Sequence, residues 1–216
     1  MALFDNKITE ILQHPSLDIP APPDPSSFVH HMEIFLDILA KWNARINLTS
    51  EKQPERILER HVFDSLQYAR ALKPGQKVLD IGSGAGFPGF PLKFLYPDLD
   101  LFLVESQKKR CNFLQTVVRE LDLIKITVVE SRAEKLAQDT TIAGTFDTVI
   151  LRAVGDLDYC LNLGEPFLKP DGRLAVKKGT GEPINLDPSS SQWSLKENFP
   201  IKGWGGELSA LLVFAR

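Results

Sequence analysis

The hydrophobic positions of this 216-residue chain follow two different spacings, and the change lies near residue 74. Up to that point apolar side chains recur every three or four residues, as on the buried face of a helix. This spacing predicts helices over residues 3–13, 25–46 and 54–72, with the proline-rich segment 15–25 as a connector. Asp24 followed by Pro25 is a typical helix start, because an acidic side chain there caps free N–H groups.

After residue 77 short apolar runs alternate with helical patterns, which predicts a doubly wound, mostly parallel sheet. The expected strands are residues 78–81, 101–105, 124–130, 146–151 and 173–177, and the expected helices are residues 91–96, 107–121, 133–138 and 156–168. Pro170-Asp171-Gly172 predicts a turn before the fifth strand. A last strand over 208–215 and a weaker candidate at 193–195 predict a terminal antiparallel hairpin, after a loop over 179–192.

These patterns predict two parts of unequal size. Residues 1–73 form a helical extension, which we expect to pack on the core and not to fold independently. Residues 74–216 form an α/β domain. The domain opens with the segment 78–91, VLDIGSGAGFPGFP, in which an apolar strand runs into alternating glycines. Glycine lets a ligand approach the backbone closely, and the helix that follows offers free N–H groups, so this unit predicts a site for a nucleotide cofactor.

Composition limits the functions that remain. Apolar residues make up 43% of the chain and charged residues 25%, which is ordinary for a globular protein. We expect no membrane span and no secretory signal, because no apolar run is long enough and no basic segment precedes one at the N-terminus. Cys111 and Cys160 stand alone and the four histidines lack ligand spacing, so we expect reduced thiols and no metal. The net charge of −3 weighs mildly against a nucleic-acid partner.

Two cofactors compete for the glycine turn. Gly84-x-Gly86-x-x-Gly89 matches the dinucleotide fingerprint, with Glu105 at a suitable distance for a ribose acid. Three features favour S-adenosylmethionine (SAM) instead. Asp80 lies inside the first strand, where a dinucleotide-binding fold has an apolar residue. The glycines follow the strand at once as Gly82-x-Gly84-x-Gly86, and a long helical extension precedes the unit. We therefore predict a class I SAM-dependent methyltransferase fold, which is Rossmann-like.

The chemistry of SAM suits these residue types. Backbone N–H groups and bare glycines accommodate its methionine part, and Asp80 is placed to hold the ammonium group directly or through water. Glu105, at the tip of the second strand, can accept hydrogen bonds from both ribose hydroxyls.

Several segments together resemble the RsmG family, also called GidB. They are VLDIGSGAGFPGFP at 78–91, LVESQKKRCNFL at 103–114, SRAE at 131–134 and FDTVILRAV at 146–154. Upstream, Trp42-Asn43-x-x-Ile46-Asn47-Leu48-Thr49 and RHVFDSL at 60–66 are also similar, and Lys177-Lys178-Gly179 stands where the family has a lysine–glycine pair. This family methylates N7 of a guanine in the decoding-region loop of bacterial 16S ribosomal RNA, with SAM as cofactor and S-adenosylhomocysteine as product.

The resemblance, together with the glycine turn, implies a set of site residues. The cofactor-binding candidates are Asp80, Gly82, Gly84, Gly86, Phe87, Glu105, Ser106, Gln107, Ala133, Glu134 and Arg152. Arg152, at the end of the fourth strand, is also the one candidate for a direct part in catalysis. His61, Asp64 and Lys178 are candidates for substrate binding, and for His61 and Asp64 the resemblance alone raises them above ordinary helix-surface residues.

The resemblance also implies the reaction and its setting. Guanine N7 already carries a lone pair, so we expect catalysis by positioning and no general base. We expect a cytoplasmic monomer whose partner is 16S ribosomal RNA, either naked or within a small-subunit particle, with no membrane and no metal. Three alternatives stay open: a methyltransferase acting on a small molecule or protein, a nicotinamide-dependent oxidoreductase, and a non-catalytic SAM-sensing or RNA-scaffolding module.

Overall fold

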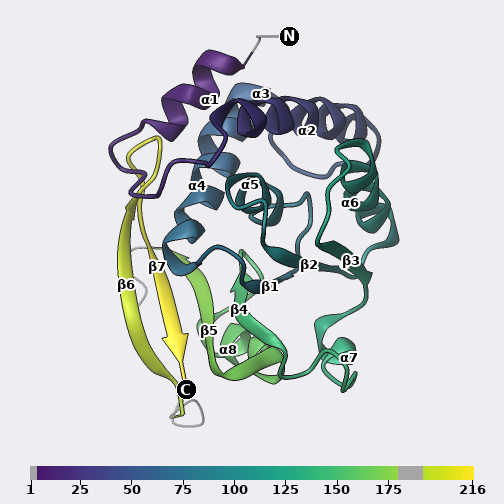
Figure 1. Cartoon of the computed structure of the whole chain (residues 1–216), viewed down its shortest axis with the longest axis vertical. Coiled ribbons are helices and arrows are strands. Elements are labelled where there is room, and N and C mark those ends of the chain that lie inside the picture. The colour runs from purple at the N-terminus through teal and green to yellow at the C-terminus, as the bar shows by residue number, and fades with distance from the viewer. Residues whose placement is uncertain (1–3, 180–191) are drawn as a thin grey trace.

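The core of the molecule is one seven-stranded sheet, seen in the computed structural model, which describes residues 4–179 and 192–216 (Figure 1). The strand order is β3-β2-β1-β4-β5-β7-β6, in which β1 to β5 are parallel and β7 runs antiparallel to both of its neighbours. The strands are β1 (Lys77–Ile81), β2 (Asp100–Glu105), β3 (Ile126–Glu130), β4 (Phe146–Leu151), β5 (Leu168–Gly179), β6 (Ser194–Lys202) and β7 (Leu208–Ala215). The predicted parallel sheet with a terminal hairpin is confirmed.

Helices cover both faces of the sheet (Figure 1). The helices of the first part are α1 (Asp5–Leu12), α2 (Pro25–Ile46), α3 (Pro54–Ile57) and α4 (Phe63–Leu66), with η1 (Leu58–Val62) and η2 (Gln67–Ala71) around α4. Those between the strands are α5 (Gly89–Leu95), α6 (Lys108–Glu120), α7 (Ala133–Leu136), α8 (Leu157–Gly164) and the short η3 (Glu165–Phe167). The N-terminal helices, α5 and α6 share one hydrophobic core, and α7 and α8 lie in a second core on the other face.

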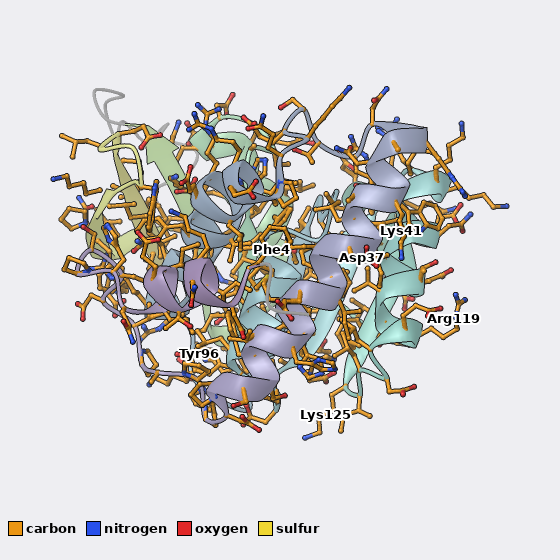
Figure 2. All side chains as sticks on the ribbon, turned by 90° about the horizontal axis from the view of Figure 1, so that it is seen from above. Phe4, Asp37, Lys41, Tyr96, Arg119 and Lys125 are labelled. Atoms are coloured by element: carbon orange, nitrogen blue, oxygen red, sulfur yellow. The ribbon has the colours of Figure 1, made fainter. Side chains whose placement is uncertain are left out.

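The first core joins the N-terminal helices to the sheet domain. Phe35 of α2 is fully buried and contacts the rings of Phe87, Phe90 and Phe94 at centroid distances of 5.4, 5.3 and 6.0 Å. Figure 2 looks onto this helical layer and shows α2 crossing it, with Asp37 and Lys41 on the outward side of the helix, where they form an exposed ion pair. Asp24 caps α2 by accepting the Ser27 N–H at 3.0 Å, as its sequence predicts.

The helix predicted over residues 54–72 is wrong as a single α-helix. The chain is helical throughout, but Leu58–Val62 forms a π-helical turn and Gln67–Ala71 a 3₁₀ turn. In the π turn the Phe63 N–H bonds the carbonyl five residues earlier, at Leu58. Apolar residues still fall on the inner side, so the hydrophobic spacing alone does not distinguish these segments from an α-helix.

Two strand boundaries also differ from the prediction. β5 begins at Leu168, so Pro170–Gly172 lie inside this strand and not in a turn before it. They form an irregularity in its pairing with β4, because Phe146 pairs with Leu168 whereas Thr148 pairs with Arg173. A proline without an N–H and a glycine suit such an irregularity. β6 runs for nine residues, well beyond the predicted 193–195, because it pairs with β7 along its length. Apart from its end residues, the loop predicted over 179–192 lies outside the described residues.

Within residues 4–179 and 192–216, no helix is both long and apolar enough to cross a bilayer. The same part of the chain contains no group of three or more histidine, cysteine, aspartate or glutamate side chains arranged to hold a metal ion. The division into residues 1–73 and 74–216 stays a prediction.

Candidate active site

The strand register places three predicted site residues and Lys177 in one row. Ile81 of β1 pairs with Val104 of β2 and Leu151 of β4, and Leu151 in turn pairs with Val176 of β5. The residues that follow these four are Gly82, Glu105, Arg152 and Lys177. Because the strands are parallel, these residues stand side by side at the carboxyl edge of the sheet, where open α/β folds bind their ligands.

The glycine turn after β1 has the backbone shape that its sequence predicts. Gly82, Gly84 and Gly86 have φ angles of 75°, 55° and 82°, in the left-handed region that other residues rarely adopt. At Gly86 a side chain would also collide with the core, since a Cβ atom would lie 2.2 Å from the ring of Phe90. Gly86 is therefore a structural requirement of the turn, whereas Gly82 and Gly84 line a cavity.

Asp80 lies beneath this turn and is almost fully buried. Its Oδ2 accepts the Gly89 N–H at 3.1 Å, while its buried Oδ1 has no hydrogen-bond partner within the described chain. Burial raises the pKa of this carboxyl to about 7, and the nearby Arg152 guanidinium works in the opposite direction. A buried acceptor without a partner is costly. A cationic group, or a water that bridges to one, would satisfy it, so this residue fits the ammonium group of SAM.

Glu105 organises the second part of the edge. Its two carboxylate oxygens accept the N–H groups of Gly84 at 3.1 Å and Gln107 at 2.8 Å, and Arg110 lies 3.7 Å away. These bonds fix the carboxylate beside the glycine turn and leave further lone pairs on both oxygens. Gln107 takes part through its backbone. This arrangement is compatible with Glu105 as an acceptor for ribose hydroxyls, and that role stays a prediction.

A cavity of about 150 Å³ lies beside Glu105, and five of the predicted cofactor residues line it: Gly82, Glu105, Ser106, Ala133 and Glu134. Tyr159 of α8 closes another side of this cavity, and its hydroxyl donates to Glu134 at 2.9 Å. Hydrogen bonds from the Glu134 N–H and from this hydroxyl lower the pKa of the Glu134 carboxyl. Tyr159 has no spacing or motif in the sequence that would have singled it out.

A second cavity of about 210 Å³ continues past the glycine turn, where Gly82, Gly84, Phe87 and Arg152 meet the N-terminal extension. The extension contributes His61 and Thr49. Eight of the eleven cofactor candidates line one or both of these cavities, and Asp80, Gly86 and Gln107 are not among the lining residues.

His61 links the extension to Arg152. Arg152 donates to His61 Nδ1 at 2.7 Å, so Nε2 carries the proton and donates to Thr49 Oγ1 at 3.0 Å. The imidazole also stacks on Phe87 at 5.2 Å. Burial and the Arg152 charge lower the pKa of His61 to about 4, so this imidazole is neutral near pH 7. The prediction that His61 lies at the site is consistent with this placement, although its role stays a prediction.

A third cavity, of about 290 Å³, lies on the far side of His61 and Arg152, which line both. Asp64 also lines it and forms an ion pair with Lys177, with 2.5 Å between Oδ2 and Nζ. Lys178, predicted like His61 and Asp64 as a substrate-binding candidate, is not among the lining residues of this cavity. Successive residues of a strand point to opposite faces, and the Lys178 charge acts on Cys160, in α8 on the other face. The structure brings Lys177 to this cavity in its place.

Other residues that shape the site were not predicted. Tyr68 is fully buried and donates to the Leu151 carbonyl at 2.8 Å, which anchors the strand end before Arg152. Asn43 holds the loop of Thr49 by accepting the Thr49 N–H at 2.9 Å. Trp204 of the β6–β7 turn lines the third cavity. Asn43 and Thr49 belong to a segment that the resemblance covers, whereas Tyr68 and Trp204 look like ordinary core aromatics in the sequence.

Comparison with known proteins adds the family. A family model for GidB, rRNA small subunit methyltransferase G, matches residues 29–202, which is most of the chain. The chain belongs to this family. The predicted resemblance to the GidB family is thereby confirmed.

Curated relatives agree with the family model. Ribosomal RNA small subunit methyltransferase G of Desulfitobacterium hafniense (strain Y51) is 43% identical over 152 residues, 70% of this chain and 63% of that protein. The protein of the same name from Streptococcus pneumoniae serotype 19F (strain G54) is 40% identical over 157 residues, 71% of this chain and 66% of that protein. The alignments therefore span slightly less than two thirds of the length of these GidB-family relatives.

A solved structure confirms the fold class. The crystal structure of a SAM dependent methyltransferase from Aquifex aeolicus matches 75% of this chain and 93% of that chain, with a TM-score of 0.55 and 17% sequence identity. Likeness at this identity concerns the fold, and it agrees with the predicted class I methyltransferase architecture.

Proposed function

We propose that this GidB-family protein is a SAM-dependent methyltransferase that modifies N7 of a guanine in small-subunit ribosomal RNA. The observation that carries the proposal is the carboxyl edge of the sheet, where Gly82, Glu105, Arg152 and Lys177 stand in one row in a chain of this family. We further propose that the protein acts in the cytoplasm as a monomer, on the 16S RNA either naked or within a small-subunit particle.

Different residues would hold the different parts of the cofactor. Glu105 and the cavity formed with Ala133, Glu134 and Tyr159 would hold the ribose and the base. The glycine turn, with Asp80 beneath it, would hold the methionine part. When bound, SAM supplies a methyl group on a positively charged sulfur.

The contribution of the protein to the transfer is mostly positioning. Guanine N7 has an in-plane lone pair, so no proton must leave it first, and we assign no general base. The neutral His61 is consistent with this, because it serves to hold Arg152 between the second and third cavities. The Phe87 ring lies 5.8 Å from the guanidinium of the same arginine, and Tyr68 anchors the strand end before it through the Leu151 carbonyl. A fixed wall at this point limits how the acceptor base can enter and so favours the in-line approach that methyl transfer needs.

The direct test is methyl transfer itself. The protein is incubated with radiolabelled SAM and either 16S RNA or small-subunit particles, and the labelled base is mapped. We expect label on N7 of one guanine. Binding of NADH without binding of SAM would instead support the oxidoreductase alternative. SAM binding with label only on a protein or small molecule would support a different methyltransferase, and SAM binding without any transfer would support a non-catalytic module.

Two variants distinguish residues needed for SAM binding from residues needed for methyl transfer. Glu105→Ala should abolish SAM binding in calorimetry, because it removes the carboxylate at the ribose position and the anchor of Gly84. Arg152→Ala should keep SAM binding and lose methylation. Arg119→Ala is the matched control, since the guanidinium of this exposed α6 arginine pairs with its neighbour Glu120. Full activity of Arg152→Ala would remove that residue from the site.

A further inference from the structure

The third cavity is distinct from the two that we assign to the cofactor. It opens beyond His61 and Arg152, and besides Arg152 its walls come from three other parts of the chain that are far apart in sequence. Glu59 to Asp64 belong to the N-terminal helices, Lys177 to β5, and Gly203, Trp204, Glu207 and Ser209 to the β6–β7 turn and the start of β7. Its volume of about 290 Å³ is at the lower end of the range for ligand sites and suits a group the size of a single base.

The outer wall of this cavity is held in place. The Lys7 ammonium lies 4.0 Å from the centroid of the Trp204 ring, and Phe63 meets the same ring edge-on at 5.7 Å. Lys7 is itself fixed by ion pairs with Glu59 at 3.0 Å and Glu10 at 3.2 Å. A fixed aromatic wall is typical of pockets that receive a base turned out of its stack.

The inner wall carries one donor beside one acceptor. Lys177 Nζ and Asp64 Oδ2 are paired within the cavity lining, and each side chain is about one fifth exposed. Lysine can donate further hydrogen bonds, and a carboxylate accepts several. Because Lys177 stands beside Arg152 in the strand row, this pair can present a donor and then an acceptor to a planar group that enters from the side of the arginine.

The Watson–Crick edge of guanine has the complementary order. From the N7 side it offers the O6 acceptor, then the N1–H donor, then the N2 amino donor. Adenine has the reverse order, a donor at N6 and an acceptor at N1. In the same position its N6 donor would face the Lys177 ammonium and its N1 acceptor would face the Asp64 carboxylate. A guanine whose N7 points toward the cofactor cavities carries O6 beside N7 on the same edge and N1–H next to O6 on the adjoining edge, so O6 and N1–H can face Lys177 and Asp64 in the third cavity.

We propose that the third cavity binds the acceptor guanine and that the Lys177–Asp64 pair selects it, with Lys177 donating to O6 and Asp64 accepting from N1–H. This inference rests on the proposed function. It assigns the ion pair a role in base selection beyond joining α4 to β5.

The experiment measures selection separately from folding and from cofactor binding. Once the labelled guanine is mapped, the substrate that supports transfer is rebuilt with adenine or 2-aminopurine at that position; 2-aminopurine lacks both O6 and N1–H. Values of kcat/KM are compared for wild type and Asp64→Asn, and SAM binding is measured by calorimetry. Asp147→Asn is the matched control, because Asp147 pairs with Lys169 at 2.6 Å and lies near the amino end of β4, away from the site.

We expect Asp64→Asn to lower kcat/KM on guanine by about tenfold to hundredfold, the range for a lost polar contact to a base edge. In Asp64→Asn the affinity for SAM should be unchanged, and the ratio of kcat/KM on guanine to kcat/KM on 2-aminopurine should decrease. In Asp147→Asn the kcat/KM on guanine, this ratio and the affinity for SAM should all equal the wild-type values. The exchanged pair, Asp64→Lys with Lys177→Asp, keeps an ion pair but reverses donor and acceptor, so it should also lose activity on guanine.

Other outcomes overturn the inference in distinguishable ways. If Asp64→Asn or the exchanged pair methylates guanine with the wild-type kcat/KM and preference, the pair is structural and only the inference is wrong. If the wild type binds SAM but labels no RNA, the proposed function is wrong and the inference falls with it.

Discussion

The substitution Asp80→Asn tests both the electrostatics of the buried carboxyl and its assigned role. Asp80 is 1% exposed, and its pKa is raised from 3.8 to about 7 by burial. A group whose pKa is higher in the folded chain stabilises the fold while it is protonated, and this contribution is lost as the pH rises. Between pH 4 and pH 7 the loss is about 3 kcal/mol. Asparagine does not ionise, so the variant should lack this loss.

Cofactor binding gives the second readout. If the ammonium group of SAM acts on Asp80, binding should ionise the carboxyl, and at pH 7 about half a proton should be released per SAM bound. The released fraction should approach zero at pH 8.5. Calorimetry in buffers of different ionisation enthalpy measures this number directly. Asp80→Asn should bind SAM more weakly and release no proton through this group.

Two results would refute this reasoning. The first is a binding enthalpy for the wild type at pH 7 that does not depend on the buffer. The second is a urea-unfolding free energy that changes with pH between 4 and 7 equally in wild type and Asp80→Asn. The first would separate Asp80 from the cofactor, and the second would mean that burial does not perturb this carboxyl.

Further predictions concern the turn and the strand end. Gly86→Ala should lower the free energy of unfolding by about 3 kcal/mol, because a positive φ and the Phe90 ring both oppose a Cβ atom; Gly144→Ala, with a positive φ and open space, should cost only about 1 kcal/mol in the same urea titration. Tyr68→Phe leaves the buried Leu151 carbonyl without its side-chain donor and should cost about 1–3 kcal/mol. It should also slow methylation more than it weakens SAM binding, and equal effects on both would argue against Tyr68 positioning Arg152.

The half of the candidate site that we assign to the cofactor could be predicted because its signals are local. The alternating glycines encode positive φ angles, and an acid inside an apolar strand is conspicuous in any sequence. Glu105 is found by counting to the end of the next strand. These residues lie on consecutive elements of a parallel sheet, so predicting the sheet already brings them together. The structure places Gly82 and Glu105 in one row, as this reasoning requires.

The other half depends on contacts between distant segments. Whether Lys177 or Lys178 faces the site is decided by the side-chain alternation of β5, and a prediction of the strand that is uncertain by one residue cannot decide it. Trp204 joins the site only because β6 and β7 pair along their length and carry their connecting turn beside α1. Tyr159 and Tyr68 act through single hydroxyl contacts at 2.9 and 2.8 Å, which leave no periodic trace in the sequence.

The π-helical turn at Leu58–Val62 has a consequence for which lengths of this segment the family can tolerate. A π turn accommodates one residue more than the α-helical turn it replaces, so deleting a single residue there would restore a regular helix. Because the π turn takes up the extra residue within one turn, the helical residues before and after it would keep nearly the same relative orientation after such a deletion, and Ile57 would stay buried. Residues inside the turn would move, and His61, which contacts Arg152, is one of them. A deletion of one residue here is therefore expected to disturb the contact between His61 and Arg152 more than the packing of the helix.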